Sequence, residues 1–187
     1  MDLFKYIKMT SLDELIKDMA KGNELGLKGI AQLYSQDLYL YASHIIKSDT
    51  LAEEIVADVF IELWKNRSNI KQIKNLKSWL LTVTRNKSIS SLRAEKKHQD
   101  TVSWNNMEWF QFESDIQLPD EQIISAEEVS KINIAINSLP SRCKEVFVLA
   151  KIEKLPYKEI SKMLNISVKT INVHVSKALR SISDELF

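Results

Sequence analysis

The stretch from Leu155 to Arg180, LPYKEISKMLNISVKTINVHVSKALR, constrains the fold of this 187-residue chain more than any other part. Its apolar residues recur three and four positions apart, which is the spacing of two short amphipathic helices and not of strands. Asn165 suits the left-handed end of the first helix, and Ser167 suits the cap of the second. The pattern therefore predicts a helix-turn-helix, with Pro156 in the first turn of its first helix.

The second predicted helix has two different faces. Its apolar side carries Ile171, Val175, Ala178 and Ile182. Its other side carries mostly short polar or basic side chains: Lys169, Asn172, Ser176 and Arg180, together with Val173. Asparagine reads adenine edges in a major groove, and lysine reads guanine or binds phosphate. This face predicts a DNA-reading helix; the alternative is a helical hairpin with a solvated face.

Composition favours a mostly helical chain with a substantial core. The chain is 44% hydrophobic and has only 3 Gly and 3 Pro, so we expect an all-α fold. No apolar run approaches the roughly 18 residues of a membrane span. The N-terminal residues also lack the uninterrupted apolar segment of a secretory signal. We therefore expect a cytoplasmic protein without membrane insertion.

Cysteine and histidine usage argues against an enzyme. Cys143 is the only cysteine, so an internal disulfide is excluded, and its apolar neighbours predict a small buried side chain. His44, His98 and His174 lie far apart and lack metal-ligand spacing. We expect no catalytic residue, no metal and no cofactor.

The net charge of +1 hides a strong segmentation. Residues 61–97 carry 10 basic and 2 acidic side chains, and residues 131–187 carry 10 and 5. Between them, residues 98–130 carry 8 acidic side chains and no Lys or Arg. Basic patches are typical of polyanion binding, so two such blocks flank one purely acidic segment.

Periodicity predicts three domain-level segments. Residues 1–97 form a helical domain, with helices at 11–21, 24–47, 51–66 and 76–97 and a basic loop at 67–74. Thr50 with Glu53 predicts a capping box, and Asn75 predicts the cap of the last helix. Residues 98–125 form an acidic, aromatic linker. Residues 126–187 form the helix-turn-helix domain, in which Ser125 with Glu128 predicts another capping box and Ser141 caps a helix.

The two helical blocks resemble the extracytoplasmic-function (ECF) type of bacterial sigma factor. The segments LYSQDLYLYASHII, AEEIVADVFIELWKN and LKSWLLTVTRNKSISSLR resemble sigma region 2. The segment INSLPSRCKEVFVLAKIEKLPYKEISKMLNISVKTINVHVSKALRSI resembles sigma region 4. Four positions depart from the family pattern: Ser90 replaces Asp, Lys154 replaces Gly, Pro156 replaces a Ser or Thr cap, and Ser161 replaces Ala.

The resemblance implies a sigma factor that directs promoter-specific transcription initiation with core RNA polymerase, promoter DNA and an anti-sigma factor as partners. Region 2 would dock on the polymerase through Glu54, Asp58, Phe60 and Trp64, although Phe60 also fits internal packing. It would open and read the minus-10 element through Lys71, Lys74, Asn86, Lys87, Ser90 and Arg93. Region 4 would read the minus-35 element through Lys169, Asn172, Val173, Ser176, Lys177 and Arg180.

The acidic linker would, by the same resemblance, mimic nucleic acid in the channel that later holds RNA. The alternative function is a LuxR-type helix-turn-helix regulator that binds a duplex operator by itself. Such a regulator needs a receiver or ligand domain in front, which is commonly α/β, and residues 1–97 show neither alternating strands nor a phosphoacceptor-like acidic pocket. An anti-sigma or adaptor protein is a further alternative, against which the two basic blocks argue.

Overall fold

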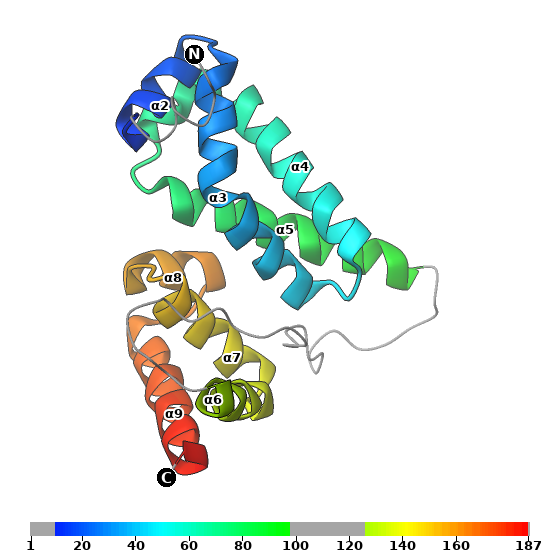
Figure 1. The fold of residues 1–187 in the computed structure, drawn as a ribbon, viewed down its shortest axis with the longest axis vertical. Coiled ribbons are helices and arrows are strands. Elements are labelled where there is room, and N and C mark those ends of the chain that lie inside the picture. The colour runs from blue at the N-terminus through cyan, green and yellow to red at the C-terminus, as the bar shows by residue number, and fades with distance from the viewer. Residues whose placement is uncertain (1–9, 98–125, 187) are drawn as a thin grey trace. The chain divides into compact units, whose positions relative to one another are not determined.

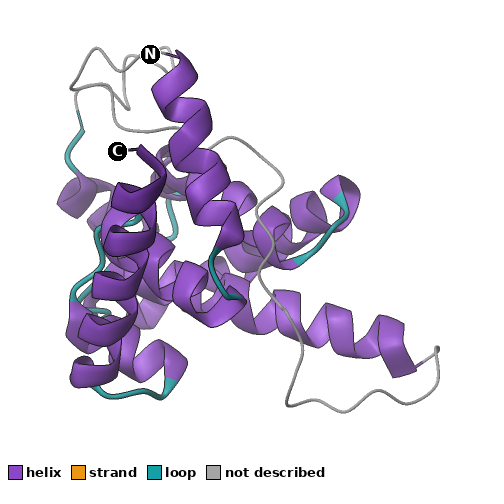
Figure 2. Ribbon diagram, turned by 90° about the horizontal axis from the view of Figure 1, so that it is seen from below, coloured by secondary structure: helices purple, strands orange, loops and turns teal. Residues whose placement is uncertain are grey.

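The computed structural model describes residues 10–97 and 126–186, and every regular element in these residues is a helix (Figure 2). This confirms the all-α prediction. The chain divides into two compact units, Met1–Asp100 and Thr101–Phe187, which are described separately. The predicted acidic linker and the cap at Ser125 lie outside the described residues.

The N-terminal unit is a bundle built around one long helix. Helices α2 (Leu12–Ala20), α3 (Glu24–Ile45), α4 (Asp49–Lys65) and α5 (Leu76–Lys97) follow in order, with the 3-10 helix η1 (Arg67–Gln72) before α5 (Figure 1). Helix α3 packs against α2, α4 and α5. The largest fully buried side chains of the unit are Leu15, Met19, Ile30, Leu38, Tyr41, Ile46, Leu63, Ile70, Leu80 and Leu81.

Helices α2 and α3 approach closely at two glycines of α3. A Cβ atom on Gly26 would lie 2.5 Å from the backbone oxygen of Leu15 and 2.5 Å from the backbone nitrogen of Met19. A Cβ atom on Gly29 would lie 2.5 Å from Cδ2 of Leu15. The missing side chains thus allow two helix backbones to meet almost directly.

Two sequence predictions about α4 and its C-terminal connection are wrong. Helix α4 is capped by Ser48, whose hydroxyl accepts a hydrogen bond from the Leu51 N–H at 3.4 Å. Thr50 therefore lies inside the first turn and makes no capping box. The predicted loop 67–74 is largely helical, because Ile70 is buried and draws residues 67–72 into η1. The predicted cap of α5 is confirmed, since Asn75 Oδ1 accepts from the Ser78 N–H at 2.9 Å.

The C-terminal unit comprises α6 (Ala126–Ser138), α7 (Ser141–Phe147), the π-helical turn η3 (Val148–Ile152), α8 (Tyr157–Leu164) and α9 (Val168–Leu186). Helix α9 packs against α6, α7 and α8. The core includes Ile136, Val146, Leu149, Ile160 and Ile171.

The predicted Ser141 cap is wrong: Pro140 holds the N-cap position of α7, and no side chain caps that end. Pro156 was predicted to lie in the first turn of α8. It occupies the N-cap position instead, directly before the first helical residue, Tyr157.

Cys143 is buried in the C-terminal unit, as predicted. Its sulfur lies 3.2 Å from the backbone oxygen of His174 on α9, to which the thiol donates. Burial raises the pKa of the Cys143 thiol, which disfavours the nucleophilic thiolate. Among the helices of residues 10–97 and 126–186, none is both long and apolar enough to cross a bilayer.

Candidate functional site

The turn between α8 and α9 is closed mainly by Ser161. Asn165 ends α8 in the left-handed conformation (φ 52°, ψ 48°), which confirms its prediction. The backbone oxygen of Ser161 accepts from the N–H groups of Asn165 and Ile166. The Ser161 hydroxyl donates to the Ile166 backbone oxygen at 2.6 Å. The serine that replaces the family's usual alanine therefore adds a hydrogen bond across the turn.

Ser167 caps α9, as the sequence predicts. Its hydroxyl oxygen accepts from the Thr170 N–H at 3.0 Å and lies 2.8 Å from the Thr170 hydroxyl. This cap satisfies one of the free N–H groups in the first turn of a helix. The start of α9 is therefore fixed by its own residues.

Helix α9 buries one face and exposes the other. Ile171 and Ala178 are fully buried, and Val175 is 5% exposed. The exposed surface of α9 includes three large apolar residues, Val168, Val173 and Leu179, of which Val173 is the most exposed at 60%. All six candidate DNA-binding residues of this helix are exposed: Lys169, Asn172, Val173, Ser176, Lys177 and Arg180. The amide of Asn172 donates to the Val168 backbone oxygen at 3.2 Å, so its carbonyl oxygen remains available as an acceptor.

Arg142 on α7 supports the helix-turn-helix from outside it, and the sequence reasoning did not identify this residue. One of its terminal nitrogens donates to the Leu164 backbone oxygen at 3.1 Å, and the other lies 3.2 Å from Glu145 Oε2. A cation at the carbonyl end of α8 complements the helix dipole.

The side chain of His174 on α9 is uncharged at pH 7. Its burial, followed by the positive charges of Arg142 and Lys177, lowers the pKa of the imidazole.

Lys154, which replaces a usual glycine, adopts a left-handed backbone conformation with φ 53°. It lies in the connection between η3 and α8, and its side chain is exposed. The left-handed region favours glycine because it has no Cβ atom. Lysine at position 154 therefore makes the folded conformation less favourable than the family's usual glycine would.

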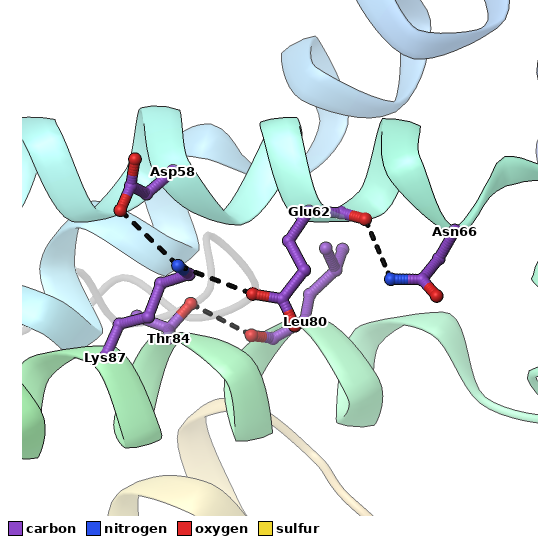
Figure 3. A network of polar contacts seen from close by, with 6 residues as sticks. All are labelled: Asp58, Glu62, Asn66, Leu80, Thr84 and Lys87. Carbon is purple, nitrogen blue, oxygen red and sulfur yellow. Dashed lines mark hydrogen bonds and ion pairs between the residues drawn. The ribbon is translucent and has the colours of Figure 1, made fainter.

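In the N-terminal unit, one lysine joins the candidate polymerase-binding and DNA-binding helices. Nζ of Lys87 on α5 lies 3.4 Å from Asp58 Oδ2 and 3.4 Å from Glu62 Oε2, both on α4. Figure 3 shows this ammonium group between the two carboxylates. The amide of Asn66 and the hydroxyl of Thr84 bond only to backbone oxygens of their own helices. Lys87 is therefore the bridge between α4 and α5 in this network.

A surface hollow of about 480 Å³ lies beside this bridge. Candidates from both helices line it. From α4 these are Glu54 and Asp58, and from α5 they are Asn86, Lys87 and Ser90. The structure thus brings together residues to which the sequence assigned two different partners.

The remaining candidate polymerase-binding residues lie apart from this hollow. Phe60 and Trp64 are half-buried, on the flank of α4 away from Glu54 and Asp58. Arg67 stacks on Trp64, with its guanidinium carbon 4.8 Å from the ring centroid. Ile61, which the sequence reasoning missed, is 51% exposed on α4. Periodicity places Ile61 outside the predicted buried stripe of α4, and an isoleucine outside that stripe is the signal that the sequence offered.

The other candidate DNA-binding residues of the N-terminal unit differ in their surroundings. Lys71 on η1 and Lys74 before α5 are exposed, and so are Asn86, Ser90 and Arg93 on α5. Lys87 is partly covered, with 28% of its side chain exposed. Lys71, Lys74 and Arg93 therefore present exposed charges, whereas the charge of Lys87 is partly covered.

Comparisons with known proteins match both units. The family model described as Sigma-70 region 2 matches residues 30–98, and the model described as Sigma-70, region 4 matches residues 132–182. The ECF RNA polymerase sigma factor SigW of Bacillus subtilis is 24% identical over 176 residues, covering 91% of this chain and 94% of that protein. SigM of the same bacterium is 29% identical over 138 residues, covering 74% and 81%.

A solved structure has the same fold. The sigma factor RpoE in complex with the anti-sigma factor NepR, from Bartonella quintana, aligns with a TM-score of 0.60 at 22% identity. The alignment covers 85% of this chain and 95% of that one.

Proposed function

The chain belongs to the sigma-70 family, as an RNA polymerase sigma factor of the ECF type, and we propose how its units share promoter recognition. The C-terminal unit reads the minus-35 element as duplex through α9. The N-terminal unit opens the minus-10 element and holds it through η1 and α5, while α4 docks on the polymerase. In this role the chain is an initiation factor of the bacterial cytoplasm and not an enzyme.

The observation that supports this proposal most directly is the division of α9. Its buried face is apolar, and its exposed face carries three cations together with Asn172 and Ser176. A helix preceded by a closed turn enters a major groove with its exposed face toward the bases. Asn172 and Lys169 contact base edges, whereas Lys177 and Arg180 contact phosphates.

In the N-terminal unit, the proposal rests on exposure and charge. Lys71, Lys74 and Arg93 bind backbone phosphates of the opened strand, and Asn86 and Ser90 bind an unstacked base at the hollow. Extruding a base costs a few kcal/mol, which phosphate and stacking contacts offset. On α4, Glu54 and Asp58 supply charge and the half-buried Phe60 and Trp64 supply apolar area for the polymerase, as suits a protein interface.

Two further parts of the proposal concern partners. The acidic segment 98–125 has no Lys or Arg, and its negative charge mimics that of nucleic acid. It therefore occupies the basic nucleic-acid channel of the polymerase until RNA displaces it. An anti-sigma factor holds the chain inactive, as NepR is found with RpoE.

The test combines the full chain with core RNA polymerase and a library of random-sequence duplexes. We expect co-elution with core, transcription that requires both proteins, and selection of two separated sequence elements. A LuxR-type regulator would instead select a duplex site without polymerase. Failure to bind core, or selection of the same site by the chain alone, contradicts the proposal.

Single variants then test α9. Asn172→Ala should relax selection at one base pair, since a bidentate contact contributes about 1–3 kcal/mol of discrimination. Lys177→Ala should weaken binding to all sequences and reduce the salt slope by about 1. Ser176→Ala is compared with Ser183→Ala, a matched change at another exposed serine of the same helix. Equal effects of these two serine variants would refute the assignment of Ser176.

A further inference from the structure

Two proposed interfaces of the N-terminal unit share one side chain. Lys87, assigned to DNA, has its ammonium group 3.4 Å from a carboxylate oxygen of Asp58 and 3.4 Å from one of Glu62. Asp58 is itself assigned to the polymerase. The Asp58 side chain is 61% exposed and the Glu62 side chain 42% exposed, so both carboxylates remain accessible to a partner.

At these distances, the two carboxylates and a DNA phosphate would compete for the same ammonium group of Lys87. A phosphate that approaches Lys87 also approaches two carboxylates, and their repulsion cancels part of the attraction. A cationic surface that binds Asp58 and Glu62 removes that repulsion and releases Lys87 toward the phosphate. Since coupling between two sites is reciprocal, DNA bound at Lys87 must in turn favour the cationic partner.

We propose that Lys87, Asp58 and Glu62 form an electrostatic link that couples polymerase docking on α4 to DNA binding on α5. In the free chain the two carboxylates suppress the affinity of α5 for DNA. On the polymerase they are neutralised, and Lys87 becomes a phosphate ligand. This inference rests on the proposed function, because it takes its two partners from there.

The experiment measures binding of the free, full-length chain to a fluorescently labelled 20-nucleotide single strand at low salt, by anisotropy. The variant Asp58→Asn/Glu62→Gln removes both ion pairs. Its matched control is Glu24→Gln/Glu53→Gln, which changes the net charge equally at exposed positions of the same unit. Each exposed ion pair is weak, so we expect the test variant, which lacks both, to bind at least about twofold more tightly than the control.

A second pair of variants isolates Lys87. With Lys87→Gln added to both backgrounds, the difference between test and control should vanish, because the released cation is then absent. Equal binding of test and control variants, or a difference that persists without Lys87, overturns the link.

Failure of the link is distinguishable from failure of the proposed function. The wild-type chain is assayed in parallel for transcription with core polymerase. Initiation by the wild type together with equal DNA binding by the two double variants refutes only the link. Absence of initiation refutes the proposed function, and with it the partners that the link requires.

Discussion

Replacing Lys154 by glycine should stabilise the C-terminal unit. Lys154 has φ 53°, and the left-handed region costs a residue with a Cβ atom about 1–2 kcal/mol. Glycine removes that cost but makes the unfolded chain more flexible, which offsets about 0.4–1 kcal/mol. The Lys154 side chain is exposed, so little packing is lost. The expected net gain is about 0.5–1 kcal/mol.

Amide hydrogen exchange measures this gain in the correct unit. The amides of Ile171 and Val175 lie in the buried centre of α9, where exchange reports the larger opening reactions. In Lys154→Gly we expect their exchange to slow about two- to fivefold. The amides of Leu80 and Leu81 in the N-terminal unit should not change.

Two controls separate backbone conformation from other effects. Lys154→Ala removes the same charge and chain but keeps the Cβ atom, so no stabilisation is expected. Asn165→Gly tests the second left-handed residue, with φ 52°; asparagine tolerates this region, and the gain should be smaller. If Lys154→Ala slows exchange as much as Lys154→Gly does, the explanation from φ is refuted.

Three other substitutions test packing, the turn and pH. Ser161→Ala should cost about 0.5–1.5 kcal/mol of stability, the usual value of one hydrogen bond, and weaken duplex binding; unchanged exchange in α9 would contradict this. Gly26→Ala should cost about 1–3 kcal/mol through overpacking, because its Cβ would lie 2.5 Å from the Leu15 oxygen; urea denaturation checks it, and an unchanged midpoint would show that α2 yields. The lowered pKa of His174 means that the unfolded chain binds its proton more tightly, so stability falls as pH drops through the unfolded value of about 6.5. His174→Gln should remove that part of the pH dependence, measured as exchange in α9 at pH 7.5 and 5.5.

Local chemistry was the part of the fold that the sequence predicted well. The left-handed end at Asn165, the cap at Ser167 and the cap at Asn75 each depend on a side chain and the few residues after it. The apolar face of α9 followed from the spacing of its hydrophobic residues along the helix. Where two residues competed for a cap, the prediction was wrong: Ser48 caps α4 in place of Thr50.

Contacts between distant residues could not be predicted from single-sequence reasoning. Lys87 meets Asp58 across 29 positions of the chain, and Arg142 meets Leu164 across 22. No local pattern marks either pair, because the crossing of the helices decides it.

The closed turn around Ser161 has a thermodynamic consequence for promoter association. Its hydroxyl and carbonyl groups hold the turn in the unbound protein, so no segment between α8 and α9 must order when a duplex arrives. Calorimetry of duplex binding by the polymerase-bound chain should then show a heat capacity change that matches buried surface alone, without a coupled-folding contribution.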